Sequence, residues 1–341
     1  MLEYCPYCLE TLGATGPDRC TGCGRPRPAL SNWPRDPLLG KVIGQQRVLR
    51  RTASPGVAVH YICEDTRDGA ERWIGCLPES LCACSDATSD RSTTLTQLRH
   101  DNLATYRGLG LVKGFGFITV VEPIPGAPLR DVLARLGRFD GQQAMWLGLQ
   151  IVQGLAAAHD VGVHHGAITP ESVWITDSGD VKLAGFEFSE AVGGPHRGCY
   201  TARLLEMPQL LAPEQLARGL DITRADIYQV AAVVYMAWTG QPHLPPLGPD
   251  LKRGLEALIS YHNRIADRLG PRPSDRIPEL RKYAPRLDSL IGSMLSSDPT
   301  RRPIAMEIVK AMWWQCAASP EPSIAAAEPA PVPLVELPPP V

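Results

Sequence analysis

The chain has 341 residues, of which 44% are hydrophobic, and a formal net charge of −2. A chain of this length and composition can bury at least one substantial core, and its length is typical of about two domains. The near-neutral charge, with Lys and Arg spread along the chain, provides no long-range field for nucleic acid or an anionic membrane surface. Charge therefore names no partner, and neither nucleic acid nor a membrane is expected to be one.

The first 26 residues contain two C-x2-C pairs that are eleven residues apart, and too few large apolar residues to build a core. This spacing is typical of a zinc ribbon, in which four thiolates form a closed shell and metal binding folds the segment. A rubredoxin-like iron site and a redox dithiol would use the same residues and stay alternatives. The predicted ligands of a structural zinc ion are Cys5, Cys8, Cys20 and Cys23.

A proline-rich linker is predicted over residues 27–40. From residue 41 the pattern becomes strand-like, because VAVHYICED, ERWIGCL and FGFITVVE alternate or group β-branched residues between turn signals such as DTRDG. The sequence therefore predicts a small β-rich lobe over residues 41–121. A hinge at about 122–128 would connect this lobe to the rest of the chain.

The hydrophobic period changes after Pro128, where segments such as QAMWLGLQIVQGLAAAHDVG place apolar residues at helical spacing. A larger helical lobe is predicted over residues 129–316. Its longest apolar run, VAAVVYMAW, has about half of the roughly 20 residues that span a bilayer, so it predicts a buried helix. Residues 317–341 are rich in Pro and Ala and are predicted to be disordered. The N-terminus lacks the pattern of a secretory signal, so we expect a cytoplasmic protein.

Several short strings then occur in the order of a bacterial Ser/Thr protein kinase domain: LRHDN, HHGAITPES, VKLAGFEFS, LAPEQL and DPTRRP. Residues 41–316 resemble this family, which implies an α+β, two-lobed protein-kinase-like fold preceded by the zinc ribbon. The resemblance implies structural roles for five residues: a buried ion pair, an acid that supports the catalytic loop, and a packing pair. These residues are Glu214 and Arg302, then Asp226, and finally His165 and Phe186.

The positions that carry the chemistry in this family are occupied by other residue types here. Phosphoryl transfer needs a lysine on the phosphates, metal-holding groups and a carboxylate that takes the hydroxyl proton. The resemblance puts Ile74 at the strand lysine, Ala167 at the proton-accepting Asp, Thr169 at the phosphate-facing Lys, Ser172 at the metal-binding Asn and Gly185 at the metal-binding Asp. No lysine occurs between Val42 and Val112, and no glutamate between Ser80 and Val121.

The glycine-rich loop of the family, where backbone N–H groups approach phosphates, is also degraded. Its counterpart ASPGVA contains Ala53, Pro55, Gly56 and Ala58, with one glycine left. We therefore expect that ATP and Mg²⁺ do not bind tightly.

These missing charges predict a catalytically inactive kinase homologue, a pseudokinase, that is not an enzyme. It would bind proteins as a scaffold or regulator, with an active kinase, a phosphatase or a signalling assembly as partner. One alternative is a divergent Ser/Thr protein kinase with weak ATP-dependent activity, in which Lys41, Glu187 or Glu190 takes over a lost role. Another is a module that senses a nucleotide or other small molecule near Glu122–Gly126 without turnover. A cleft filled by its own side chains would argue against this last alternative.

Overall fold

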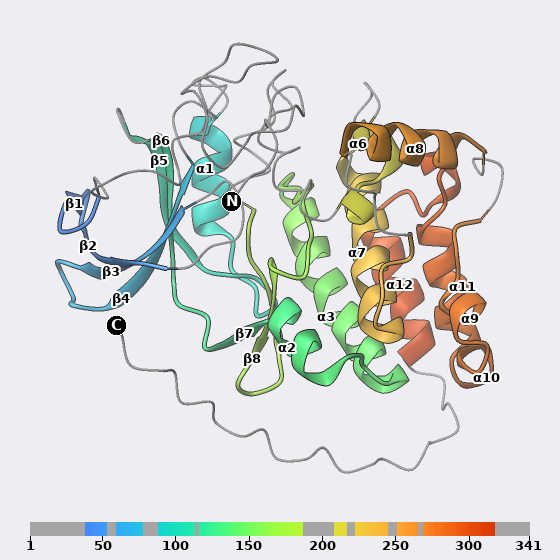
Figure 1. The fold of residues 1–341 in the computed structure, drawn as a ribbon. Helices are drawn as coiled ribbons and strands as arrows, with labels where there is room; N and C mark the ends of the chain where they lie inside the picture. The colour runs from blue at the N-terminus through green and yellow to red at the C-terminus, as the bar shows by residue number, and fades with distance from the viewer. Residues whose placement is uncertain are drawn as a thin grey trace.

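The computed structural model describes residues 38–52, 59–77, 88–112, 116–186, 208–216, 222–244, 251–264 and 269–317 (Figure 1). These residues form a β-sheet lobe and a helical lobe, as the resemblance implies for a two-lobed fold. The cysteine segment, nearly all of the predicted linker, and the predicted tail beyond residue 317 lie outside the described residues. The structural expectations for these segments therefore stay predictions.

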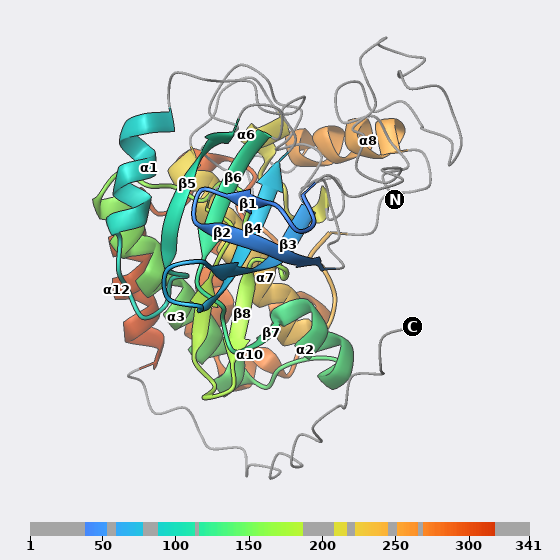
Figure 2. The same ribbon diagram turned by 90° about the vertical axis from the view of Figure 1, so that its left-hand side faces the viewer.

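Six antiparallel strands form the sheet of the first lobe, in the order β1-β2-β3-β4-β6-β5. Alternate side chains on β2, β3 and β4 meet in a small core that includes Val48, Cys63 and Ile74, because successive residues of a strand point to opposite faces. Figure 2 shows this sheet in front of the helical lobe. The strands are β1 (Val42–Ile43), β2 (Gln46–Arg51), β3 (Val59–Asp65), β4 (Glu71–Leu77), β5 (Tyr106–Val112) and β6 (Gly116–Val121).

One helix, α1 (Thr88–Gln97), packs against β5 of this sheet (Figures 1 and 2). Its sequence TSDRSTTLTQ is mostly polar, and Leu95 supplies its fully buried apolar contact. Leu95 belongs to the large core that continues into the helical lobe. The helix is therefore held in place by tertiary packing more than by an apolar stripe of its own.

A three-stranded sheet connects the hinge to the helical lobe, with the order β7 (Gly126–Pro128), β8 (Val173–Thr176) and β9 (Val181–Leu183). Gly126 has a φ of 135° and lies opposite Thr176. A Cβ atom at this position would lie 2.1 Å from the carbonyl oxygen of Ile175, so only glycine fits. The distal end of the hinge is therefore fixed to β8.

Two long helices form the centre of the second lobe, α3 (Gly141–Asp160) and α7 (Ile222–Thr239). A capping box starts α3, because the Asp140 side chain accepts from the Gln143 N–H and the Gln143 side chain accepts from the Asp140 N–H. Fourteen of the eighteen residues of α7 are buried. The apolar run VAAVVYMAW is thus a buried helix, as predicted, because a helix that is hydrophobic all round is buried on every side.

The C-terminal helix α12 (Met306–Ala317) packs closely along α3. Trp313 is fully buried, and its Nε1–H donates to the carbonyl oxygen of Met145 at 2.9 Å. Its ring lies over Gly148, where an added Cβ atom would come within 1.9 Å of the ring. The absence of a side chain at Gly148 is therefore what allows the two helices to approach.

Shorter elements complete the helical lobe around these long helices. They are α2 (Leu129–Leu136), η2 (Pro208–Leu210), α6 (Pro213–Leu216), α8 (Leu251–Arg264), α9 (Pro273–Arg276), α10 (Leu280–Tyr283), α11 (Pro285–Met294) and η3 (Pro299–Arg301). Within the described ranges, no helix is both long enough and apolar enough to cross a bilayer.

Candidate active site

Asp226 on α7 holds the backbone of the segment HGAITPES. Its Oδ2 accepts the backbone N–H of His165 at 2.9 Å and the Nε2–H of His159 at 2.8 Å, and its Oδ1 accepts the N–H of Gly166. Burial by itself would raise the pKa of Asp226, but the hydrogen bond and charge of His159 outweigh burial and hold it below its ordinary value. The buried carboxylate therefore stays ionised and fixes two consecutive peptide groups.

Two buried glutamines hold the same segment from the side. Gln229 accepts the N–H of Ile168 at 2.9 Å and donates to Gln215 at 3.0 Å. Gln215 donates to the carbonyl oxygen of Gly166 at 2.9 Å and accepts the N–H of Ala212 at the same distance. Sequence reasoning missed both residues. The position of Gln229 directly before the apolar run of α7 was a usable signal, because buried polar groups need partners.

The three substituted positions of this segment are all buried. Ala167 is 1% exposed and offers a methyl group where the resemblance places a carboxylate. The Ser172 hydroxyl donates to the carbonyl oxygen of Thr169 and accepts its N–H, both at 2.9 Å. Within the described part of the chain, the Thr169 hydroxyl has no hydrogen-bond partner. Of the two side-chain hydroxyls at these positions, that of Ser172 therefore stabilises the shape of the loop.

The segment Ala184–Phe186 is held by contacts from both lobes. Nε2–H of His165 donates to the carbonyl oxygen of Ala184 at 2.8 Å, and its ring packs on Phe186 with centroids 4.7 Å apart. From the first lobe, the Tyr106 hydroxyl accepts the backbone N–H groups of Gly185 and Phe186 at 2.9 and 3.1 Å. Gly185 has a φ of 93°, a conformation that favours glycine. Sequence reasoning did not single out Tyr106.

These residues do not fit a Mg²⁺ site. In sites of phosphoryl transfer, Mg²⁺ is bound through carboxylates and substrate phosphates. Gly185 has no side chain, and the one proton and one lone pair of Ser172 Oγ already bond within the loop. Among the described residues, no group of three or more His, Cys, Asp or Glu side chains is placed to hold a metal ion.

Several predicted residues lie outside the described residues. They are the zinc ligands Cys5, Cys8, Cys20 and Cys23, the loop residues Ala53, Pro55, Gly56 and Ala58, and the acids Glu187 and Glu190. Their roles stay predictions.

Glu214 and Arg302 form a buried, bidentate ion pair. The two guanidinium nitrogens donate to the two carboxylate oxygens at 2.6 and 2.9 Å. Arg302 also donates to the carbonyl oxygens of Ser296 and Arg224, both at 2.8 Å, and lies over the ring of Tyr228 at 4.8 Å from its centroid. The pair joins α6 to the segment before α12, and its saturation with hydrogen bonds offsets the desolvation of both charges.

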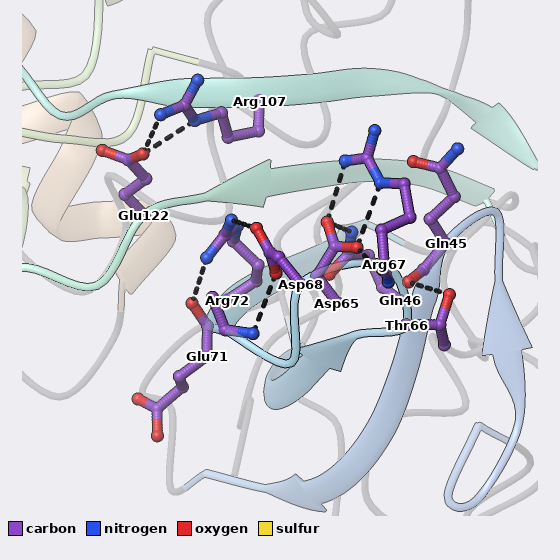
Figure 3. A network of polar contacts seen from close by, with 11 residues as sticks. Gln45, Gln46, Asp65, Thr66, Arg67, Asp68, Glu71, Arg72, Arg107 and Glu122 are labelled. Atoms are coloured by element: carbon purple, nitrogen blue, oxygen red, sulfur yellow. Dashed lines mark hydrogen bonds and ion pairs between the residues drawn. The ribbon is translucent and has the colours of Figure 1, made fainter.

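Polar contacts also fix the first lobe beside the hinge (Figure 3). Asp65 accepts from Gln46 at 2.9 Å and from Arg67 at 2.9 and 3.1 Å. Hydrogen bonds from the side chain and backbone of Arg67, and then from Gln46, lower the pKa of Asp65. Farther along the sheet, Arg107 donates to Glu122, the first residue of the hinge, with its Nε at 2.7 Å. The β3–β4 turn and the start of the hinge are thereby held in place.

The strand that should carry the phosphate-binding lysine is β4. Ile74 is fully buried in the small core of the sheet, so its side chain points away from the helical lobe. Its neighbours Trp73 and Gly75 occupy the opposite face. A Cβ atom at Gly75 would lie 2.8 Å from the Thr119 hydroxyl, closer than side chains normally approach. The lobe-facing positions of β4 therefore belong to Trp73 and Gly75 and not to Ile74.

Trp73 reaches across to the second lobe. Its ring contacts that of Trp174 on β8, with centroids 5.1 Å apart and planes tilted by 46°. The sequence analysis placed Trp73 in the strand-like segment ERWIGCL and did not single out Trp174. The large aromatic ring in each of these short strands was the signal that could have identified them.

The sequence profile of the protein kinase domain matches residues 85–314 of the chain. Together with the two-lobed fold and the segment HGAITPES held by Asp226, this match shows that the chain belongs to the protein kinase domain family. The matched region begins after β4, so the first four strands lie outside it.

Individual relatives are named Ser/Thr-protein kinases. PknL of Mycobacterium tuberculosis is 33% identical over 186 residues, which cover 54% of this chain and 43% of PknL. Kinase pkn2 of Myxococcus xanthus is 30% identical over 270 residues, 76% of this chain and 31% of that protein. PknD of M. tuberculosis is 27% identical over 270 residues, 78% and 39% of the two chains. The chain thus spans less than half of the length of each of these relatives.

These findings correct the expectation that the protein is not an enzyme. That expectation rested on neutral residues at single positions such as Ala167 and Gly185. It is wrong, because the family match and the named relatives point to a kinase enzyme. They favour the alternative that sequence reasoning left open, a divergent Ser/Thr kinase.

Proposed function

We propose that the chain is a divergent Ser/Thr protein kinase that transfers the terminal phosphoryl group of ATP slowly to hydroxyl groups of protein substrates. The observation that carries this proposal is that the Asp226 carboxylate accepts hydrogen bonds from the backbone N–H groups of His165 and Gly166. It keeps the segment that would face the substrate hydroxyl in one conformation. Family membership and the names of the relatives support the same activity.

Slow turnover follows from the residues present. A positioned general base contributes about 10²–10⁴-fold to a proton transfer, and Ala167 has no group that accepts a proton. Positioning of two reactants still lowers the barrier without such a base. The nucleotide-sensing alternative has less support, because the relatives that match the chain are named as kinases and not as proteins that bind a nucleotide without turnover.

The test is a phosphotransfer assay on the full chain. Purified protein is incubated with ATP, a divalent metal and a generic protein substrate, and phosphorylated Ser and Thr residues are identified by mass spectrometry. We expect weak labelling by the native chain. Because a positioned base contributes at least about a hundredfold in working enzymes, Ala167→Asp should raise the rate at least about tenfold.

The matched control is Ala167→Asn, which has nearly the same shape and accepts no proton. It should label no faster than the native chain, and thermal melting checks that both variants fold. Equal labelling by all three proteins would identify a contaminating kinase. No labelling by any of them would overturn the proposed function.

A further inference from the structure

The contact between Trp73 and Trp174 is a direct aromatic bridge between the lobes. Trp73 comes from β4 of the six-stranded sheet and Trp174 from β8 of the small sheet. The indole N–H of Trp73 donates to Glu71 Oε1 on the same face of β4 at 3.2 Å, which orients the ring. Both tryptophans are partly exposed, so the rings meet at the edge of the core and not in its centre.

The strand registers place this bridge beside the hinge. Trp73 lies opposite Val121, the last residue before the hinge, and Trp174 lies opposite Pro128, the last residue of the hinge. The two rings therefore start from opposite ends of the hinge and meet alongside it. The resemblance to the kinase family implies that the base of a nucleotide would bind at this hinge backbone, near Glu122–Gly126.

The ring separation leaves no room for a purine. A planar base held between two indole rings needs about 3.5 Å of contact distance on each face, so the rings would be about 7 Å apart. The centroids are 5.1 Å apart, and the planes are tilted by 46°. The tryptophans must part before a base enters at this place.

We propose that Trp73 and Trp174 form a gate that restricts the access of ATP to the hinge, and that these two residues set the nucleotide affinity of the enzyme. This inference rests on the proposed kinase function. Because aromatic rings in contact gain packing and quadrupole energy, ATP competes with an intact pair. Removal of either ring removes the competitor and leaves the other ring as a stacking surface for the base.

The experiment is isothermal titration calorimetry of the full chain with ATP in the absence of divalent metal. Trp73→Ala and Trp174→Ala are each expected to bind ATP at least about tenfold more tightly than the native chain, which corresponds to about 1.4 kcal/mol. Trp146→Ala is the matched control, because Trp146 is 51% exposed on α3 and is not part of the bridge. It should bind as the native chain does.

A second variant and a second ligand complete the titration experiment. Trp73→Leu retains an apolar side chain without the ring and replaces Trp73→Ala if that variant fails to show cooperative melting. Inorganic triphosphate should show no gain in affinity, since the gate acts on the base. Equal ATP affinity of the native chain and the folded variants, no binding by any of them, or an equal gain for triphosphate would each overturn the gate.

Failure of the gate and failure of the kinase proposal give different results. The titration contains neither metal nor phosphate acceptor, so it reports base binding alone. A gain in ATP affinity without any phosphotransfer would leave the gate standing and overturn the kinase proposal. Phosphotransfer by the native chain with unchanged affinity in the variants would do the reverse.

Discussion

Tyr106 illustrates how one side chain fixes a functional segment. Its hydroxyl oxygen accepts two consecutive backbone N–H groups, those of Gly185 and Phe186, from a strand of the other lobe. The ring is 1% exposed, so water is no substitute partner for these groups. A buried N–H without a partner costs about 1–3 kcal/mol. The conformation of the Gly-Phe segment therefore depends on an atom that lies outside it.

We predict that Tyr106→Phe lowers the free energy of unfolding by about 2 kcal/mol, because it leaves two buried N–H groups unpaired. Urea denaturation measures the loss. Amide hydrogen exchange should also speed up at Gly185 and Phe186. The control Tyr261→Phe, at a partly exposed site on α8, should change neither. An unchanged exchange rate at both amides would contradict the role of the hydroxyl.

At the scale of a helix, α3 shows packing overriding intrinsic propensity. Glycine in a helix interior is about 1 kcal/mol less favourable than alanine, so α3 would gain from replacing Gly148. The ring of Trp313 occupies the place of the missing methyl group. Gly148 thus allows α3 and α12 to approach closely, at the cost of a lower helix propensity in α3.

Gly148→Ala is therefore expected to destabilise the fold by about 1–3 kcal/mol, the usual range for overpacked cores. Gly141→Ala on the same helix is the matched control. Its new Cβ atom would lie 3.7 Å from the nearest atom of Trp238, an ordinary contact, so it should be neutral or slightly stabilising. Thermal melting of both variants decides the matter, and equal effects would rule out the Trp313 contact as the cause.

For the whole molecule, two buried histidines in the helical lobe couple stability to pH. Tyr228 shares a 2.7 Å hydrogen bond with His243, and Ser297 shares one of 2.8 Å with His262. Burial lowers the pKa of His243 to about 3, helped by the charges of His262 and Arg276. Burial and the charge of Arg302 lower the pKa of His262 to about 4. Both side chains are therefore neutral in the folded protein near pH 7.

We predict that the free energy of unfolding falls as the pH decreases from 6.5 toward 4. In this window the unfolded chain protonates both histidines and the folded chain does not, so the unfolded state binds more protons and gains stability. Urea denaturation at several pH values measures the slope. Replacing both His243 and His262 with Gln should flatten it, whereas His60→Gln on β3 should not. An unchanged slope in the double variant would contradict the prediction.

The architecture was predictable where the signal was local or followed a family pattern. The run VAAVVYMAW predicted the buried helix α7, and the order of the kinase-like strings predicted two lobes. The contacts between lobes were not predictable, because Tyr106 and Gly185 are 79 positions apart and periodicity describes only neighbours along the chain. The same limit hid the meeting of Trp73 and Trp174. Charge counting at single positions also predicted too much, since it implied a protein without enzymatic activity.

The hinge has a mechanical consequence. Glu122 is hydrogen-bonded to Arg107 and Gly126 lies against β8. Between them, Pro123 and Pro125 flank Ile124, which is 4% exposed in the large core, and the Pro125 carbonyl accepts the N–H of Asp177 at 3.2 Å. The two prolines have φ fixed near about −65°, so few torsions remain. The lobes are thus connected by a stiff hinge, and Trp73 and Trp174 lie opposite its two ends. A rotation of one lobe against the other would change the separation of the two rings, so the proposed gate implies that a stiffer hinge opens it less readily.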